Sequence, residues 1–156
     1  MNTTVLDNMT KLVSGKDARV YITIKGVPYL LYEASAFNAG LNPSNQDVQT
    51  LGSHIVGALP TGYSVTASVS EYVYRDDVTI GPILEAIKNG EPIVFDIQTV
   101  LDRTLIDGQE QRFTFRNCVP DGTIDIIKIA MGEVSSRDLA FRVNAVPEVV
   151  KLFTAA

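Results

Sequence analysis

The sequence predicts a mainly β protein, a β-sandwich or barrel that carries one α-helix. Several short segments alternate apolar and polar residues, which is the pattern of a strand with one buried face, and residues typical of turns separate them. Helical periodicity is sustained in one segment, so the sequence lacks the repeated strand–helix alternation of a parallel α/β fold.

Eight segments have the strand pattern. The first two are predicted to form a hairpin about a Gly26-Val27 corner, because alternate residues of the first are apolar and a glycine ends it. Asp107 and Gly108 mark a turn between two later strands. The predicted strands are 18–26, 27–35, 48–55, 63–74, 92–101, 111–120, 122–132 and 137–146.

The predicted helix runs from about 77 to 89. Asp76 or Asp77 is suited to cap its N-terminus, Lys88 lies in its last turn, and Gly90 fits its end. Its apolar stripe consists of Ile80, Ile83, Leu84 and Ile87.

Two segments are predicted to lie outside this framework. Residues 1–17 form an N-terminal arm, and Ala36–Val48 forms a long loop because it holds Gly, Pro and four Asn or Asp residues. A loop of this length in a compact domain usually has a function. We expect one domain over 1–156, with the β-sandwich core at 18–153.

The composition argues against several classes of protein. Hydrophobic residues make up 46% of the 156 residues and charged residues 20%, which is too apolar for a disordered chain. Cys118 is the only cysteine, so no intrachain disulfide forms. The net charge of −5 lacks the surplus of Lys and Arg that grips nucleic acid. No leader and no apolar run near about 20 residues is visible, so we expect no export signal and no membrane insertion.

Residues with catalytic chemistry are scarce. His54 is the sole histidine and lies in no G-x-S-x-G motif, while Cys118 falls inside a predicted strand and is expected in the core. Asp76 and Asp77 are better explained as helix caps than as a metal or acid–base pair. We therefore expect no enzyme, no cofactor and no metal site.

Glycines recur at five-residue spacing just before the 63–74 strand. They are Gly52, Gly57 and Gly62, but neither the lysine of a phosphate-binding loop nor a helix follows them. We interpret them as a bend in which the chain passes close to another backbone.

The polar side of the 63–74 strand is unusual. It consists of Ser64, Thr66, Ser68 and Ser70, which alternate with Val65, Ala67 and Val69. An ordinary solvent-facing strand side would be richer in Lys and Glu. Short uncharged side chains suit a surface that faces another object at close range.

Four segments in this order resemble a known family. They are "VQTLGSHIVGALPTGYSVTASVSEYVY", "ILEAIKNGEPIVFDIQ", "FTFRNCVPDG" and "LAFRVNAVPEVVKLF". The sequence is similar, over about 18–153, to tail tube proteins of contractile-tailed bacteriophages and phage-tail-like bacteriocins. The type of Gram-positive myophages and defective prophages is the most similar group. Type VI secretion tube proteins share this fold.

The resemblance implies a β-sandwich subunit that assembles into hexameric rings, which stack into a hollow tube for DNA ejection. Its implied partners are other copies of itself, the tail sheath, the tape-measure protein, the baseplate, and DNA that passes through the lumen without specific binding. It also implies a location in the virion tail and, during assembly, in the host cytoplasm. Three alternatives remain at this point: a type VI secretion-like tube, a monomeric ligand-binding β-barrel and a hydrolase.

In such a tube, particular residues are expected to line the lumen, to join neighbouring rings or to face outward. The candidate lumen lining is Ser64, Thr66, Ser68 and Ser70, extended by Asp96 and Gln98. The candidate inter-ring contacts are Val5, Leu6 and Met9 in the arm and Phe37, Asn38 and Leu41 in the loop. The outer face of the helix is expected to show Glu85, Lys88 and Asn89. A basic residue such as Arg116 as the main lumen lining would contradict this assignment, and deleting 36–47 is expected to leave a folded subunit without long tubes.

Overall fold

The computed structural model describes residues 18–154 except 32–33, 74–75, 78 and 104–107, so the predicted arm, 1–17, lies outside the described residues. The described chain is mainly β with one helix, which confirms the predicted fold class. Its elements are β1 (Ala18–Ile24), β2 (Val27–Leu30), β3 (Ala34–Val48), β4 (Gly57–Tyr72), α2 (Ile80–Asn89), β5 (Phe95–Arg103), β6 (Gln109–Pro120), β7 (Ser136–Val143) and β8 (Glu148–Lys151).

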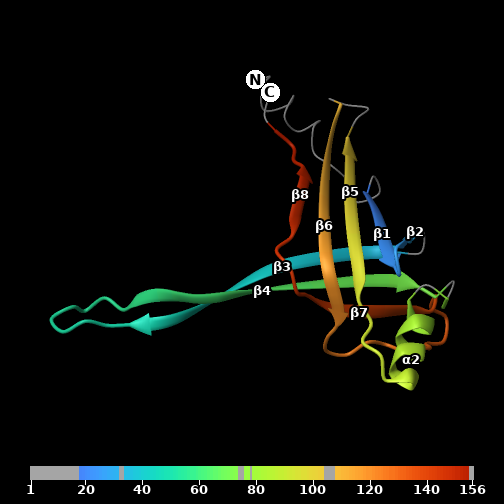
Figure 1. The fold of residues 1–156 in the computed structure, drawn as a ribbon, viewed down its shortest axis with the longest axis horizontal. Coiled ribbons are helices and arrows are strands. Elements are labelled where there is room, and N and C mark those ends of the chain that lie inside the picture. Colours follow the sequence, from blue (N-terminus) through green and yellow to red (C-terminus); the bar gives the residue numbers. More distant parts are fainter. Residues whose placement is uncertain (1–17, 32–33, 74–75, 78, 104–107, 155–156) are drawn as a thin grey trace.

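The strands form one continuous antiparallel sheet folded into two layers, whose strands cross steeply in Figure 1. The first layer has the order β2-β1-β5-β6, with β8 also paired to β6. The second layer has the order β7-β4-β3. β6 joins the two layers because it pairs with β5 over most of its length while its last residues, Cys118–Pro120, pair with β7. The fold is therefore a β-sandwich closed at one corner.

The core lies between the two layers and is apolar. The ring of Phe95 on β5 meets that of Phe141 on β7 at a centroid distance of 5.6 Å, nearly perpendicular. The most deeply buried apolar side chains come from both layers and include Ile22, Val69, Phe95, Ile97, Leu139 and Phe141. An interior filled by such side chains differs from that of a ligand-binding barrel, which needs convergent polar groups.

The predicted hairpin of β1 and β2 is confirmed, with a shifted turn. Ile24 pairs with Val27, so the two turn residues are Lys25 and Gly26 rather than Gly26 and Val27. Both have positive φ, 50° and 82°, as a two-residue hairpin turn of type I′ requires.

The helix starts later than predicted and is not capped by an aspartate. Thr79 is the N-cap residue and makes no capping hydrogen bond through its side chain. Pro82 is tolerated because backbone N–H groups in the first turn have no partner within the helix. The predicted end is confirmed, since Gly90 adopts a φ of 68° and its N–H donates to the last helical carbonyls.

A buried charge cluster fastens α2 to the sandwich. On β7, the almost fully buried Arg137 places Nε 2.7 Å from Oε1 of the fully buried Glu71 on β4, and its Nη2 lies 2.6 Å from Oδ1 of Asp76. The hydroxyl of Thr79 donates to the same Oε1 at 3.0 Å. Burial alone would lower the pKa of Arg137, but its hydrogen bonds to the two carboxylates outweigh burial and raise that pKa. Asp76 thus neutralises Arg137 instead of capping the helix.

Gly81, in the first turn of α2, is tightly confined. Its N–H donates to the backbone oxygen of Asp76 at 2.7 Å, and a Cβ on residue 81 would also lie 2.7 Å from that oxygen. Gly81→Ala therefore has to displace backbone, and we expect it to lower the free energy of unfolding by about 1–3 kcal/mol. Denaturant melts measure this, with Gly62→Ala as the control because no atom lies within 4 Å of a Cβ there. Equal stability of the two variants would contradict the expectation.

Three predictions about regular structure are wrong. The expected loop over 36–48 is part of β3, which pairs with β4 along its whole length. Most of the expected strand over 48–55 is the connection between these two strands, where Gly52 has a φ of 82° and the N–H of Ser53 bonds to the carbonyl of Thr50. The expected strand over 122–132 is absent. In addition, β8 was not predicted.

Candidate functional site

The distal half of the β3–β4 hairpin projects far from the sandwich, toward the left of Figure 1. We call residues 40–63 the hairpin arm. Nearly every residue in it is exposed. The large hydrophobic side chains exposed there are Leu41, Val48, Leu51, Ile55, Val56, Leu59 and Tyr63. A soluble monomer rarely exposes so many apolar side chains in one segment, so the arm is a candidate interaction surface.

Backbone pairing and small polar side chains hold the arm together. The ladder is unbroken from Leu41↔Val65 to Ser44↔Gly62, shifts by one residue, and continues to Val48↔Gly57. The hydroxyl of Thr61 donates to the carbonyl oxygen of Ser44 at 3.0 Å, which closes the irregular position. The arm has no apolar core of its own, so burial of its side chains requires another molecule.

The predicted alternation along β4 is present. Val65, Ala67 and Val69 are buried, while Thr66 and Ser68 are exposed and Ser64 and Ser70 are half-buried. We call the outward row of Ser64, Thr66, Ser68 and Ser70 the hydroxyl face. Its cross-strand neighbours on β3 and β7 are also short or polar, and they are Ala36, Asn38, Gly40, Asn42, Asp138, Ala140 and Arg142.

The one basic side chain among these neighbours, Arg142, is paired with an acid, and the acidic Asp138 is hydrogen-bonded to the face itself. Asp138 accepts a hydrogen bond of 2.7 Å from the hydroxyl of Ser70, and the Nε of Arg142 lies 3.3 Å from Oδ2 of Asp121. The face therefore presents hydroxyls, one carboxylate and an arginine whose charge is paired, rather than a row of free basic groups that would hold phosphates.

The structure separates Asp96 and Gln98 from this row. They lie on β5, which pairs with β1 and β6 in the other layer and not with β4. Arg116, on the neighbouring β6, has Nε 3.0 Å from Oε1 of Glu148 and Nη1 3.7 Å from Oδ2 of Asp96. Its charge is therefore shared between two carboxylates.

The predicted inter-ring residues fall in three places. Val5, Leu6 and Met9 lie outside the described residues. Leu41 is exposed in the hairpin arm, and Asn38 is exposed beside the hydroxyl face. Phe37 is less available for such a contact than the sequence suggests, because its side chain packs partly against the core, with its ring centroid 5.7 Å from that of Phe115.

A second exposed apolar surface lies beside α2. Glu85, Lys88 and Asn89 are exposed on the helix, and Leu84 and Ile87 of the predicted buried stripe are exposed too. The segment before β7 adds further exposed side chains. We call the exposed apolar side chains of α2 and of this segment together the helix-side patch, and they are Leu84, Ile87, Ile126, Ile127, Ile129, Met131 and Val134. Leu84, Ile126, Ile127 and Ile129 among them line one groove.

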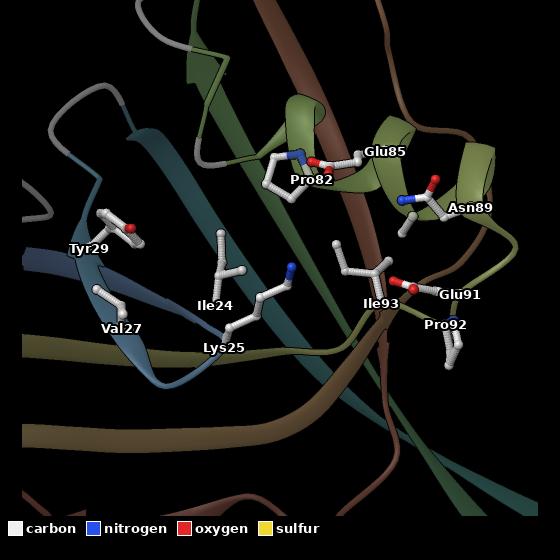
Figure 2. A pocket seen from close by; sticks show the side chains of 11 residues that line it. Ile24, Lys25, Val27, Tyr29, Pro82, Glu85, Asn89, Glu91, Pro92 and Ile93 are labelled. Carbon is white, nitrogen blue, oxygen red and sulfur yellow. The ribbon is translucent and has the colours of Figure 1, made fainter.

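A groove of about 310 Å³ lies between the β1–β2 turn and α2 (Figure 2). Its lining combines apolar side chains such as Ile24, Val27 and Ile93 with polar ones, and Figure 2 shows the side chain of Lys25 pointing into the space between Ile24 and Ile93. Glu85 and Glu91 flank it. Neither histidine nor cysteine lines this groove, so it holds no Ser-His or Cys-His pair.

The residues considered for chemistry are dispersed. His54 is exposed in the connection at the tip of the hairpin arm, whereas Cys118 is buried in the core. Within the part of the chain that the structure describes, no group of three His, Cys, Asp or Glu residues could hold a metal ion. The described residues also contain no helix long and apolar enough to cross a membrane.

Comparison with protein families finds a match over residues 7–146, to the family described as "Phage tail tube protein". This match covers most of the chain, including the hairpin arm, the hydroxyl face and the helix-side patch. No curated protein sequence matches this chain.

Several solved structures share the fold. The SPP1 tail tube matches with a TM-score of 0.66 at 11% identity over 92% of this chain and 81% of the other. The PVC sheath–tube complex of an extracellular contractile injection system matches at 0.63 and 10% identity over 96% and 99% of the two chains. The virion of a gene transfer agent matches at 0.59 and 17% identity over 89% and 99%.

Proposed function

The chain belongs to the phage tail tube protein family, and from this premise we propose that it assembles into six-membered rings that stack into the inner tube of a contractile tail. A tail-like particle without a genome would use the same tube. The proposal gives the chain a structural role, with no catalysis and no cofactor. Its partners are other copies of the chain, the sheath around the tube, the tape-measure protein inside it and the baseplate at its end.

The hairpin arm is the observation that carries this proposal. Its exposed hydrophobic side chains have no core to enter within the described subunit. Removing such side chains from water contributes roughly 25 cal/mol for each Å² of apolar surface, so their burial against other copies favours assembly. Open sheet edges on β2, β3 and β8 offer further backbone groups for pairing between subunits. A ring then closes by joining unlike patches of successive copies.

We assign the hydroxyl face to the wall of the tube lumen. Short uncharged side chains add no counterion-release affinity for DNA, so DNA would pass this wall without being held. Asp96 and Gln98 are left out of the wall, because they lie in the other layer.

Electron microscopy of the purified protein tests the assembly itself. We expect hollow rods or stacked rings of uniform width. A protein that stays monomeric at high concentration and in high salt, and shows neither rods nor rings, would overturn the proposal and favour the ligand-binding alternative.

Labelling of Ser68→Cys tests the assignment of the lumen. In assembled tubes, we expect a small biotin–maleimide to react at residue 68 but streptavidin to be excluded from the attached biotin. The same variant before assembly is the control and should bind streptavidin. Streptavidin decorating the outside of the tubes in micrographs would show that the hydroxyl face lies elsewhere.

A further inference from the structure

The helix-side patch surrounds a groove that the described subunit leaves open. The groove has a volume of about 590 Å³ and lies between α2 and the segment before β7. Its apolar lining residues are Val73, Ile80, Leu84, Ile126, Ile127 and Ile129. Ile127 and Ile129 are about three quarters exposed, and Met131 is fully exposed. The patch therefore has the composition of a core without a covering layer.

The segment 124–131 has the residues of a strand but does not form one. It alternates Ile127, Ile129 and Met131 with Lys128 and Ala130, a pattern that favours a half-buried strand. In the structure, its start is tied to the sheet by two hydrogen bonds, from the N–H of Asp125 to the carbonyl of Asp138 and from the N–H of Asp138 to Oδ2 of Asp125. Such a segment gains most from a partner that buries its side chains.

The hairpin arm and the helix-side patch lie at opposite ends of the subunit. Figure 1 shows the arm extending to the left, whereas α2 and the β6–β7 connection lie at the lower right. Two apolar surfaces on opposite ends suit a heterologous contact, in which the arm of one copy meets the patch of the next. Repetition of that contact extends an assembly, whereas a two-fold contact would end at a dimer.

Each surface carries one charge that has no partner within the described subunit, and the two are opposite in sign, whereas the other charged residues of the groove, Asp76 and Arg137, pair with each other. Asp47 is the only Asp, Glu, Lys or Arg in the hairpin arm, and Lys128 lies between two isoleucines of the patch. Neither residue forms an ion pair with another described residue of the subunit. An acidic group on the arm and a basic group on the patch fix the direction of docking more than they add affinity.

We propose that the hairpin arm of one copy docks on the helix-side patch of another copy, with Asp47 paired to Lys128. The inference rests on the proposed tube assembly and names the surface that receives the arm. It accounts for both exposed apolar surfaces with a single repeated contact.

Disulfide cross-linking tests the contact. Cys118 gives little background, because burial, with a smaller contribution from Asp96, raises the pKa of its thiol to about 12 and keeps it protonated. We expect tubes made from a mixture of Leu51→Cys and Ile127→Cys subunits to form disulfide-linked dimers on mild oxidation. Tubes that mix Leu51→Cys with Ser70→Cys, on the hydroxyl face, are the control and should form none.

The outcomes separate this inference from the proposed function. If tubes form but the Leu51→Cys and Ile127→Cys mixture gives no cross-linked dimers, the proposed docking is wrong. The proposed tube assembly is not affected by that result, whether or not the control mixture cross-links. Preferential cross-linking of Ile127→Cys to Val5→Cys would assign the patch to the N-terminal segment instead. A wild-type protein that forms no tubes would refute the assembly itself.

If the cysteine variants do not assemble, exchanging the charges of Asp47 and Lys128 tests the docking instead. Asp47→Lys and Lys128→Asp should each shorten the tubes several-fold, and the double variant should restore their length. Double-variant tubes no longer than those of the single variants would overturn the pairing.

Discussion

Replacing residues 43–63 with an Asn-Gly turn is expected to yield a folded subunit that forms no tubes. Asn42 and Ser64 face each other in the β3–β4 ladder, so a two-residue turn is able to join them. The replaced residues contribute no member of the buried core, which begins at Val65 on this strand. We therefore expect native circular dichroism and a stability within about 1 kcal/mol of wild type, together with loss of every filament in electron micrographs.

A smaller replacement serves as the matched control. Joining Val48 to Gly57 by Asn-Gly removes only the tip of the arm, because these two residues also face each other. Unlike the larger replacement, this variant keeps Val48, Leu59 and Tyr63, and it should retain ring contacts while its tubes are shortened. Long hollow tubes from the larger replacement would contradict the role of the arm.

The replacement of 43–63 is a better test than the deletion of 36–47 that the sequence suggests. That deletion would remove Phe37 and Ala39, which pack against the core, together with most of the strand that pairs with β4. Loss of tubes would then follow from loss of folding. Only the residues beyond Asn42 are separable from the sandwich.

Arg137→Met is expected to lower the free energy of unfolding by about 3–5 kcal/mol, because it leaves the carboxylate of Glu71 buried without its charge partner. Glu71 also keeps one oxygen, Oε2, without a hydrogen-bond partner, so it has little to compensate the loss. Asp76 would lose the bond that ties the chain before α2 to β7. Urea denaturation followed by circular dichroism measures the change.

Arg142→Met on the same strand is the control. Its guanidinium is about half exposed and pairs with the equally exposed Asp121, so solvent screens the interaction and we expect a loss below about 1 kcal/mol. The double variant Glu71→Met/Arg137→Met should recover a large part of the stability lost by Arg137→Met, because no uncompensated charge stays buried. Similar losses in Arg137→Met and Arg142→Met would show that burial does not set the strength of this pair.

The sequence by itself determined those features that depend on local pattern. Alternation along β4 identified Val65, Ala67 and Val69 as inward residues, and the structure buries all three. Gly90 was recognised as the end of the helix because its positive φ is a local requirement. Such features need only the backbone preferences of a few neighbouring residues and the periodicity of one element.

Only the tertiary structure decided which segments with ambiguous patterns become strands. The stretch 36–48 has the composition of a loop, yet it is a strand because each of its residues finds a cross-strand partner in β4. The stretch 122–132 has the composition of a strand but stays irregular, because no strand of the described subunit pairs with it. Asp76 looked like a helix cap and instead neutralises Arg137, which is distant in sequence. Strand pairing and charge pairing depend on what the fold brings alongside a segment, and that information lies outside the segment itself.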